Sequence, residues 1–427
     1  MSPQTDTRLG RSERNNPGGT LVARSVAAHR QAVQELLSGL AHIDGTEELP
    51  LMGALGRVLA ADVLAPLSLP PFANSQMDGF AVRAADLAPH AGSDAGAELT
   101  VVDPVPAGAA PVRLMPGTAA PIMTGAMMPE GADAVVPIEQ AVPDVFPVPG
   151  VPSTVRLPTT EPGTFVRDAG SDITAGTVAL RGGTALGPGQ LGLLAALGMT
   201  AVEVRTPVRV LLVTTGDEVV EPGMSLPEGK IYDSNGTLLE AAMLQSGLHV
   251  TRTGISGDNP TELLALLRSL GGTVDLIVST GGVSKGAYEV VRQAMTDQPV
   301  EFVSVAMQPG GPQGIGTFDG LPFLGFPGNP VSCLVSFEMF LRPALAAVVG
   351  SPALRPSLQA RLAESLTSPA GKHQVRRGTL LPGGTVKLEG GPGSHLIHAL
   401  ANSNALVQVP AAVTELDAGA EVEVWML

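Results

Sequence analysis

The sequence predicts a multidomain protein of the α/β plus β class, built around a doubly wound, mostly parallel α/β domain. The 427 residues exceed the ~100 to 200 residues that are usual for one domain. Strands rich in Val, Ile and Leu alternate with helical segments over residues 206–350, which indicates a parallel sheet covered on both faces. Short β-like runs bounded by Pro and Gly fill residues 66–165 and return over residues 355–427. We therefore expect a β-rich inserted domain and a C-terminal β-barrel in addition to the α/β domain.

The N-terminal residues 1–20 contain arginines but no apolar core segment, so they predict a disordered tail and neither a secretory signal nor a membrane anchor. Val33, Leu36 and Leu37 then recur at helical spacing, and Ser25 is a suitable N-cap. An amphipathic helix is expected here.

This helix is expected to belong to a mixed α/β linker domain that is discontinuous in sequence, formed by residues 21–65 and 166–205. The β-rich domain, residues 66–165, would be inserted between the two segments, and it ends in the Pro-rich stretch VFPVPGVPSTVRLPTTEPG.

The α/β domain over residues 206–350 begins with the strand VRVLLVTTG and continues through LLEAAMLQSG, TELLALLRSL and VDLIVSTGG. Open sheets of this kind bind ligands at the carboxyl ends of their strands. Beyond it, VRRGTLL, TVKLEG, ALVQVP and AEVEVWML read as the strands of a compact β-barrel over residues 355–427.

Composition excludes some partners and compartments. The formal net charge of −15 argues against nucleic acid and anionic membranes, which require a broad basic surface. The single cysteine, Cys333, has no internal disulfide partner, which fits a reducing, cytoplasmic compartment. The apolar segment VSCLVSFEMFLRPALAAVV is interrupted by Glu338 and Arg342, so we interpret it as a core helix and not as a membrane span.

Three polar clusters follow three hydrophobic strands of the α/β domain. Asp217 and Glu218 follow the first strand within TTGDEVVEPG, and the glycine turn STGGVSKGAYEV follows another. FPGNPVS follows the strand LPFLGF, and its Asn329 or Ser332 is placed to cap the last long helix and turn free N–H groups toward an anion. All three clusters should gather at one edge of the sheet.

Each cluster taken alone has an ordinary structural interpretation as a loop or a strand-to-helix turn. Together they suit a phosphate-bearing ligand on the glycine loop and helix N-terminus, with carboxylates nearby for a divalent cation. His395 and His398 lack a matching Cys/His set, and there is no G-x-S-x-G elbow, so neither a zinc site nor a Ser/His/Asp hydrolase is expected.

The phrases NSQMDGFAV, TTGDEVVEPG, KIYDSNG, STGGVSKGAYE, VAMQPGGPQG, FPGNPVS and GSHL occur in an order that resembles the molybdopterin molybdenumtransferase family (MoeA, related to the E domain of plant Cnx and of gephyrin). The resemblance covers nearly the whole chain after the tail. It implies a MogA-like α/β domain in a four-domain subunit, and an elongated homodimer whose active site lies between subunits. It further implies that adenylylated molybdopterin and molybdate, with Mg²⁺, give molybdenum cofactor and AMP, and that a molybdopterin adenylyltransferase is a further partner.

The resemblance also assigns residues. The expected catalytic residues are Asp78, Asp172, Asp217 and Glu289, and Asp217 and Glu218 are the expected metal ligands. The expected binding residues are Thr215, Gly216, Glu218, Asp233, Asn235, Gly281, Gly282, Ser284, Pro327, Gly328, Asn329, Ser332 and Ser394.

Two features of this chain depart from the family pattern. Glu289 stands where many relatives have an aspartate. Lysines that many relatives carry near the positions of Ser304, Gln308 and Gly311 are absent, so cationic charge must come from elsewhere. The candidates are Arg167, Lys285, Lys372, Arg376 and Arg377.

The missing lysines leave two alternatives to the transferase. One is a pterin-binding or scaffold homologue with little activity, and the other is a nucleotide pyrophosphatase or adenylyltransferase on the same fold.

Overall fold

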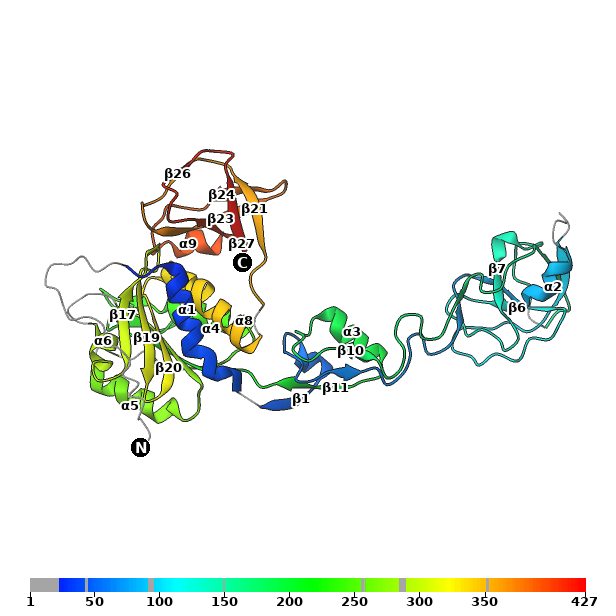
Figure 1. Ribbon diagram of the computed structural model, residues 1–427, viewed down its shortest axis with the longest axis horizontal. Helices are drawn as coiled ribbons and strands as arrows, with labels where there is room; N and C mark the ends of the chain where they lie inside the picture. The colour runs from blue at the N-terminus through cyan, green and yellow to red at the C-terminus, as the bar shows by residue number, and fades with distance from the viewer. Residues whose placement is uncertain are drawn as a thin grey trace, which may run out of the picture. The chain divides into compact units, whose positions relative to one another are not determined.

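The computed structural model describes residues 23–42, 45–90, 96–148, 150–254, 257, 259–283, 289–350 and 353–427. The chain forms two compact units, of which unit 1 joins Met1–Asp44 to Thr206–Leu427 and unit 2 is Gly45–Arg205 (Figure 1). The expected tail and the expected binding residue Ser284 lie outside the described residues.

The centre of unit 1 is a six-stranded sheet in the order β15-β12-β16-β20-β19-β17. The first four strands are parallel and the last two pairings are antiparallel, which confirms the predicted mostly parallel sheet. In sheet order the strands are His249–Arg252, Arg209–Thr214, Leu276–Thr280, Leu321–Phe326, Pro312–Phe318 and Val300–Ser304.

Helices cover both faces of this sheet, as the near-continuous apolar strands predict. Along β12, Val210 and Leu212 belong to one buried cluster, and Leu211 and Val213 belong to the other. The first cluster involves α4 (Ser234–Gln245) and the helix formed by α7 (Pro330–Ser336), a π-helical turn (Phe337–Leu341) and α8 (Arg342–Val349). The second involves α5 (Pro260–Gly271) and α6 (Val290–Ala294).

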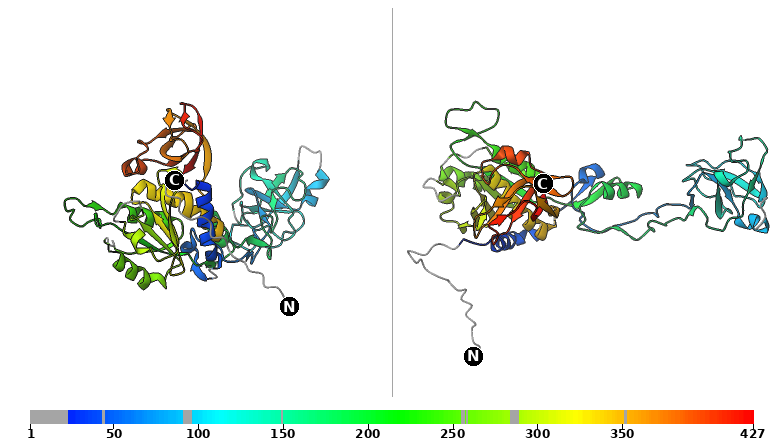
Figure 2. Two further views of the ribbon diagram at one scale, coloured as in Figure 1. Left: turned by 60° about the vertical axis from the view of Figure 1, so that its left-hand side comes forward. Right: turned by 90° about the horizontal axis from the view of Figure 1, so that it is seen from above.

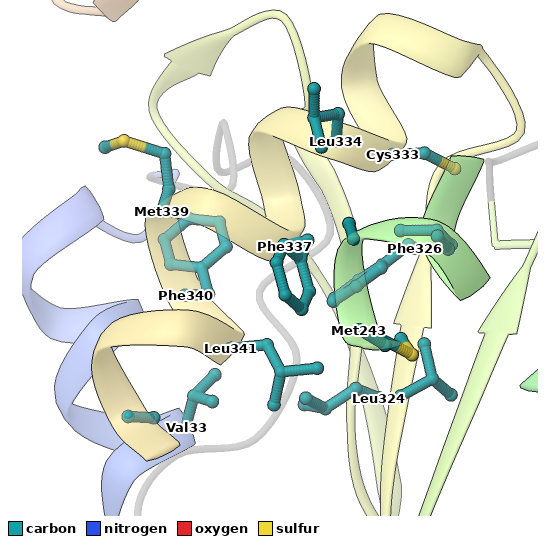
Figure 3. Close-up of a cluster of buried hydrophobic side chains, with 14 of the residues drawn as sticks. Val33, Met243, Leu324, Phe326, Cys333, Leu334, Phe337, Met339, Phe340 and Leu341 are labelled. Atoms are coloured by element: carbon teal, nitrogen blue, oxygen red, sulfur yellow. The ribbon is translucent and has the colours of Figure 1, made fainter. Parts of the chain in front are cut away.

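Helix α1 (Val26–Leu37) also packs in unit 1, where it contacts α8. Val33 is fully buried there with Phe340 and Leu341 (Figure 3), and the Ser25 side chain accepts a hydrogen bond of 3.1 Å from the Ala28 N–H, which confirms the predicted cap. The expectation that this helix belongs to the linker domain with residues 166–205 is therefore wrong. Helical spacing specifies which face is buried but not which partner covers it.

Within the described residues, one helix is long and apolar enough to cross a membrane, Pro330–Val349, and 78% of its most apolar window is buried inside the protein. The Glu338 side chain is completely buried in this helix and pairs with Arg342 and Arg355, each at 2.8 Å. The helix is thus the central core helix of unit 1.

The C-terminal strands form the predicted barrel. β23 pairs with β24 on one side and β25 on the other, which closes the five strands β23-β24-β21-β27-β25. These strands, orange to red, form a layer distinct from the green strands of the α/β sheet (Figure 2). The short strand β18 (Met307–Gln308) pairs in parallel with β23 and so connects the two parts of unit 1. In barrel order the strands are His373–Leu381, Thr385–Leu388, Ser357–Leu362, Glu421–Met426 and Ala405–Val409.

Unit 2 begins and ends in an antiparallel ribbon of β1 (Thr46–Pro50) and β11 (Ala201–Arg205). Leu59, Leu194 and Val204 share one core, near helix α3 (Pro188–Ala196). The β-rich part has separate cores and a five-stranded sheet in the order β7-β4-β6-β5-β8. In sheet order the strands are Ala134–Pro137, Gly79–Val82, Thr118–Ile122, Ala97–Val101 and Thr154–Leu157. The domain boundaries within unit 2 stay predictions.

Candidate active site

A cavity of about 1150 Å³ lies in unit 1, at the carboxyl ends of β12, β16 and β20. Loops following these strands form one part of its wall, and residues 304–312 and the barrel form another. Of the binding residues expected in this unit, those that line the cavity are Thr215, Gly216, Glu218, Asp233, Asn235, Gly281, Gly282, Pro327, Gly328, Asn329, Ser332 and Ser394. The structure therefore brings the three polar clusters together.

The glycine turn after β16 needs residues without a side chain. Gly281 and Gly282 have φ angles of +93° and +64°, in the left-handed region. A Cβ atom on Gly281 would lie 2.7 Å from the carbonyl oxygen of Thr215, and one on Gly282 would lie 2.8 Å from a methyl group of Val291. The turn thus lets the backbone run close to the cavity and to the preceding loop.

Side chains from the end of β16, the start of α4 and helix α7 hold the loop after β20. The Cys333 thiol donates to the Pro327 carbonyl at 2.8 Å and lies 2.8 Å from the Thr280 hydroxyl. The Asn235 amide donates to the Gly328 carbonyl at 2.5 Å and to the Thr280 hydroxyl at 3.1 Å. Burial raises the pKa of Cys333 to about 12, so this residue is a neutral thiol that supports the loop.

The start of α7 differs from the prediction in one respect. Asn329 is the N-cap residue, but its side chain makes no capping hydrogen bond, and it is exposed in the cavity wall. Pro330 has no N–H, and the Val331 N–H donates to the Ser394 carbonyl of the barrel at 3.1 Å. The Ser332 N–H is the amide at this end that bonds to no described residue, so fewer N–H groups face the cavity than the sequence predicts.

Two carboxylates are available at the cavity. Glu218 is exposed and lines it, with its carboxylate folded against Gly216, where a Cβ would lie 2.7 Å from an oxygen of Glu218. Glu289 also lines the cavity, at the N-cap of α6, and is half-buried. Asp217 is exposed beside the lining residues, and the Lys230 ammonium donates to its backbone carbonyl. These are hard oxygen donors of the kind that Mg²⁺ prefers.

Asp233 has a structural task. One oxygen accepts from the Gly236 N–H at 2.8 Å at the start of α4, and the other pairs with Arg252 at 2.8 Å. Arg252 also pairs with Glu221 at 3.0 Å. Both carboxylate oxygens of Asp233 are thus engaged within the protein, and the carboxylate sets the position of Asn235.

Two of the predicted catalytic residues, Asp78 and Asp172, lie in unit 2, and both are exposed. Asp78 accepts from the Thr124 N–H at 2.7 Å and from the Thr124 hydroxyl at 2.8 Å. These bonds hold the pKa of Asp78 below its ordinary value, the backbone bond having the larger effect. The backbone N–H of Asp172 donates to the Leu69 carbonyl at 3.0 Å. Their catalytic roles stay predictions.

The candidate cations separate into different environments. Lys372 lines the cavity, whereas Lys285 lies outside the described residues. Arg376 and Arg377 are buried and donate to the carbonyls of Gly390 and Gly391, so they fix the glycine loop before Ser394. Arg167 belongs to unit 2, where it donates to the Asn74 side chain at 3.2 Å.

Sequence reasoning missed most of the barrel's contribution to the site. Pro392, His395 and Ile397 line the cavity beside Gly393 and the expected Ser394. The phrase GSHL, residues 393–396, was the available signal.

Comparison with known proteins gives matches along most of the chain. Residues 24–198 match the MoeA N-terminal region (domain I and II), residues 211–347 match a probable molybdopterin binding domain, and residues 359–427 match the MoeA C-terminal region (domain IV). The chain belongs to the molybdopterin molybdenumtransferase (MoeA) family. Family membership assigns it to molybdenum cofactor biosynthesis as a transferase.

Individual relatives extend over almost the full length of this MoeA-family chain. It is 44% identical to molybdopterin molybdenumtransferase 2 of Mycobacterium tuberculosis (strain ATCC 25618 / H37Rv), over 95% of this chain and 100% of that protein. It is 32% identical to molybdopterin molybdenumtransferase of Haemophilus influenzae, over 92% of this chain and 97% of that one. A crystal structure of a molybdopterin biosynthesis moeA protein from Pyrococcus horikoshii OT3 is similar with a TM-score of 0.79 at 27% identity, covering 95% of this chain and 100% of the other.

Proposed function

We propose that this MoeA-family chain inserts molybdate into adenylylated molybdopterin and releases AMP. The observation that carries the proposal is the cavity in unit 1, where a glycine turn, carboxylates and a lysine line one space of about 1150 Å³. A ligand with a planar apolar part, a pyrophosphate and a nucleoside needs a site of this size and mixed polarity.

The residues of the wall have separate tasks in this proposal. The turn at Gly281 and Gly282 allows phosphate oxygens to approach the backbone. The Ser332 N–H donates to an oxyanion, and the loop at Pro327 and Gly328 holds that N–H in place through its hydrogen bonds to Cys333, Thr280 and Asn235.

Asp217 and Glu218 are the residues that would hold Mg²⁺. Among the described residues, no group of three or more His, Cys, Asp or Glu side chains is close enough to hold a metal ion alone. The remaining ligands would be water and substrate phosphate oxygens, which is usual for this ion. When bound, Mg²⁺ supplies positive charge that neutralises a pyrophosphate. Glu289, half-buried at the cavity wall, is placed to accept a proton from water or substrate.

Further parts of the proposal concern the whole assembly. We propose a cytoplasmic homodimer in which Asp78 and Asp172 act at an active site formed between subunits, with a molybdopterin adenylyltransferase delivering the substrate. The support for Asp78 is its geometry, since this exposed carboxylate is held in position by the N–H and the hydroxyl of Thr124. Light scattering of the purified protein tests the dimer, and a monomeric mass would refute it.

The deciding experiment measures AMP release from adenylylated molybdopterin and Mg²⁺, with and without molybdate. Release that depends on molybdate is the expected result. Tight substrate binding with no release would instead indicate a scaffold, and release at the same rate without molybdate would indicate a pyrophosphatase.

A further inference from the structure

Charge is segregated in the wall of the cavity. The lining carboxylates, Glu218, Asp233 and Glu289, all come from the loops and helix starts of the α/β part. The lining residues in the segment 304–312 and in the barrel include no carboxylate. Lys372 is the one Lys or Arg among the described lining residues, and it lies on this second side.

The ammonium group of Lys372 is not committed to a carboxylate. Lys372 forms no ion pair with the described residues, and its side chain is exposed. Arg376 and Arg377, in the strand β23 that follows Lys372, are buried, and each donates to a backbone carbonyl. An unpaired cation at a cavity wall without carboxylates is suited to an anionic ligand.

The backbone on either side of Lys372 is fixed. Its own N–H donates to the Pro369 carbonyl at 3.3 Å, and the next N–H, that of His373, donates to the Ala306 carbonyl at 2.9 Å. β18 and β23 then pair in register, and the side chains of Gln308 and Gln374 bond at 2.7 Å. The backbone at Lys372 is therefore held beside the segment 304–312 by these hydrogen bonds.

From this geometry we infer that Lys372 binds the oxyanion substrate and sets its affinity. The ligand class is a tetrahedral oxyanion, which is molybdate if the proposed function is right, so the inference rests on that function. The divalent cation and the pyrophosphate would bind on the opposite side of the cavity, which carries the carboxylates. The oxyanion and the pyrophosphate then bind on opposite sides of one cavity. This arrangement keeps the negatively charged oxyanion away from the carboxylates of Glu218 and Glu289.

The test compares Lys372→Gln and Lys372→Arg with the wild-type protein in two assays. The first is AMP release as a function of molybdate concentration. Loss of one charged contact should raise KM for molybdate about 10- to 100-fold in Lys372→Gln with a small change in kcat, and Lys372→Arg should remain near wild type. The second is equilibrium dialysis of the substrate-free protein with molybdate, where Lys372→Gln should bind more weakly by a similar factor.

Two further variants make the test specific. Lys387→Gln removes the same charge from an exposed position of the same barrel, where the lysine pairs with Glu389 at 3.6 Å, and it should leave KM unchanged. Ser304→Lys returns a cation to the same side of the cavity, from an exposed lining position, and should restore molybdate affinity in the Lys372→Gln background.

The outcomes separate the inference from the proposed function. Equal molybdate affinity in wild type and Lys372→Gln, or equal weakening in Lys387→Gln, would overturn the role of Lys372 even if AMP release depends on molybdate. Wild type that binds molybdate through Lys372 in dialysis but releases no AMP would refute the proposed function and leave the oxyanion site standing. Wild type that binds no molybdate in either assay would refute both.

Discussion

Replacement of Gly281 by alanine is the sharpest test of how the glycine turn is built. Gly281 has a φ of +93°, and the left-handed region costs a residue with a Cβ atom roughly 1–2 kcal/mol. The new Cβ would also lie 2.7 Å from the Thr215 carbonyl oxygen. The backbone at Gly281 and at Thr215 is held in place on both sides. The Gly281 N–H donates to the Phe326 carbonyl at 3.1 Å, and the Thr215 N–H donates to the Thr280 carbonyl at 3.0 Å. Overpacking adds about 1–3 kcal/mol, so we expect a total of roughly 2–5 kcal/mol.

The matched control is Gly328→Ala, in the neighbouring loop of the same cavity. Gly328 does not adopt a left-handed φ, and the nearest atom to an added Cβ would be the Gly281 Cα at 3.5 Å, which is ordinary contact. We expect less than about 1 kcal/mol of destabilisation for this variant. The phrase PGNP is therefore stiff because of its prolines and hydrogen bonds, and not because Gly328 needs a special conformation.

Differential scanning calorimetry of the two variants measures the difference. At about 2–4 °C per kcal/mol for a unit of this size, Gly281→Ala should lower the melting temperature of unit 1 by roughly 4–20 °C, and Gly328→Ala should lower it by only a few degrees. The melting temperature of unit 2 should not change. Equal shifts for the two variants would show that the close approach to Thr215 is not what requires glycine at position 281.

Three other predictions follow from buried or hydrogen-bonded groups. Cys333→Ala removes the donor to the Pro327 carbonyl, whereas Cys333→Ser keeps one, so the alanine variant should raise KM for the pterin substrate more. Steady-state kinetics at saturating molybdate measures this difference, and equal KM values in the two variants would contradict the prediction. Burial, with a smaller effect of Arg24, lowers the pKa of His29 to about 4, so its neutral form stabilises unit 1 fully above pH 6.5, and this stability is lost as pH falls from 6.5 toward 4. That difference of about 3 kcal/mol should be absent in His29→Leu, and melting curves at several pH values measure it. The depressed pKa of Asp78 should rise in Thr124→Ala but stay below its ordinary value, because the backbone bond remains; an NMR titration that shows no change would rule out the hydroxyl contribution.

The sequence predicted the elements whose signal is local. Val210 to Val213 of β12 are buried on both faces, and apolar runs of this kind that alternate with helical segments indicate central parallel strands. The placement of Gly281 and Gly282 after a strand likewise predicted a close approach of the backbone, because glycine serves few other purposes there.

Non-local partners account for what the sequence could not predict. Helix α1 has the correct buried face, but its partner α8 lies about three hundred residues later in the chain, as the residue bounds show. Asn329 has the side chain of a cap, yet the barrel carbonyl of Ser394 bonds to the adjacent N–H of Val331 instead. Lys372 reaches the cavity because β18 and β23 pair, and sequence alone gives no signal for that pairing.

The ribbon of β1 and β11 has a consequence for synthesis of the chain. Thr46 and Arg205 are directly paired, so the chain leaves and re-enters unit 1 at neighbouring points, and unit 2 is complete once residue 205 has been made. Helix α1 is made before the elements that it contacts most in the described structure, the turn Phe337–Leu341 and helix α8. Unit 2 can therefore fold during translation. Helix α1, in contrast, can pack against the turn Phe337–Leu341 and α8 only after more than three quarters of the chain has been made.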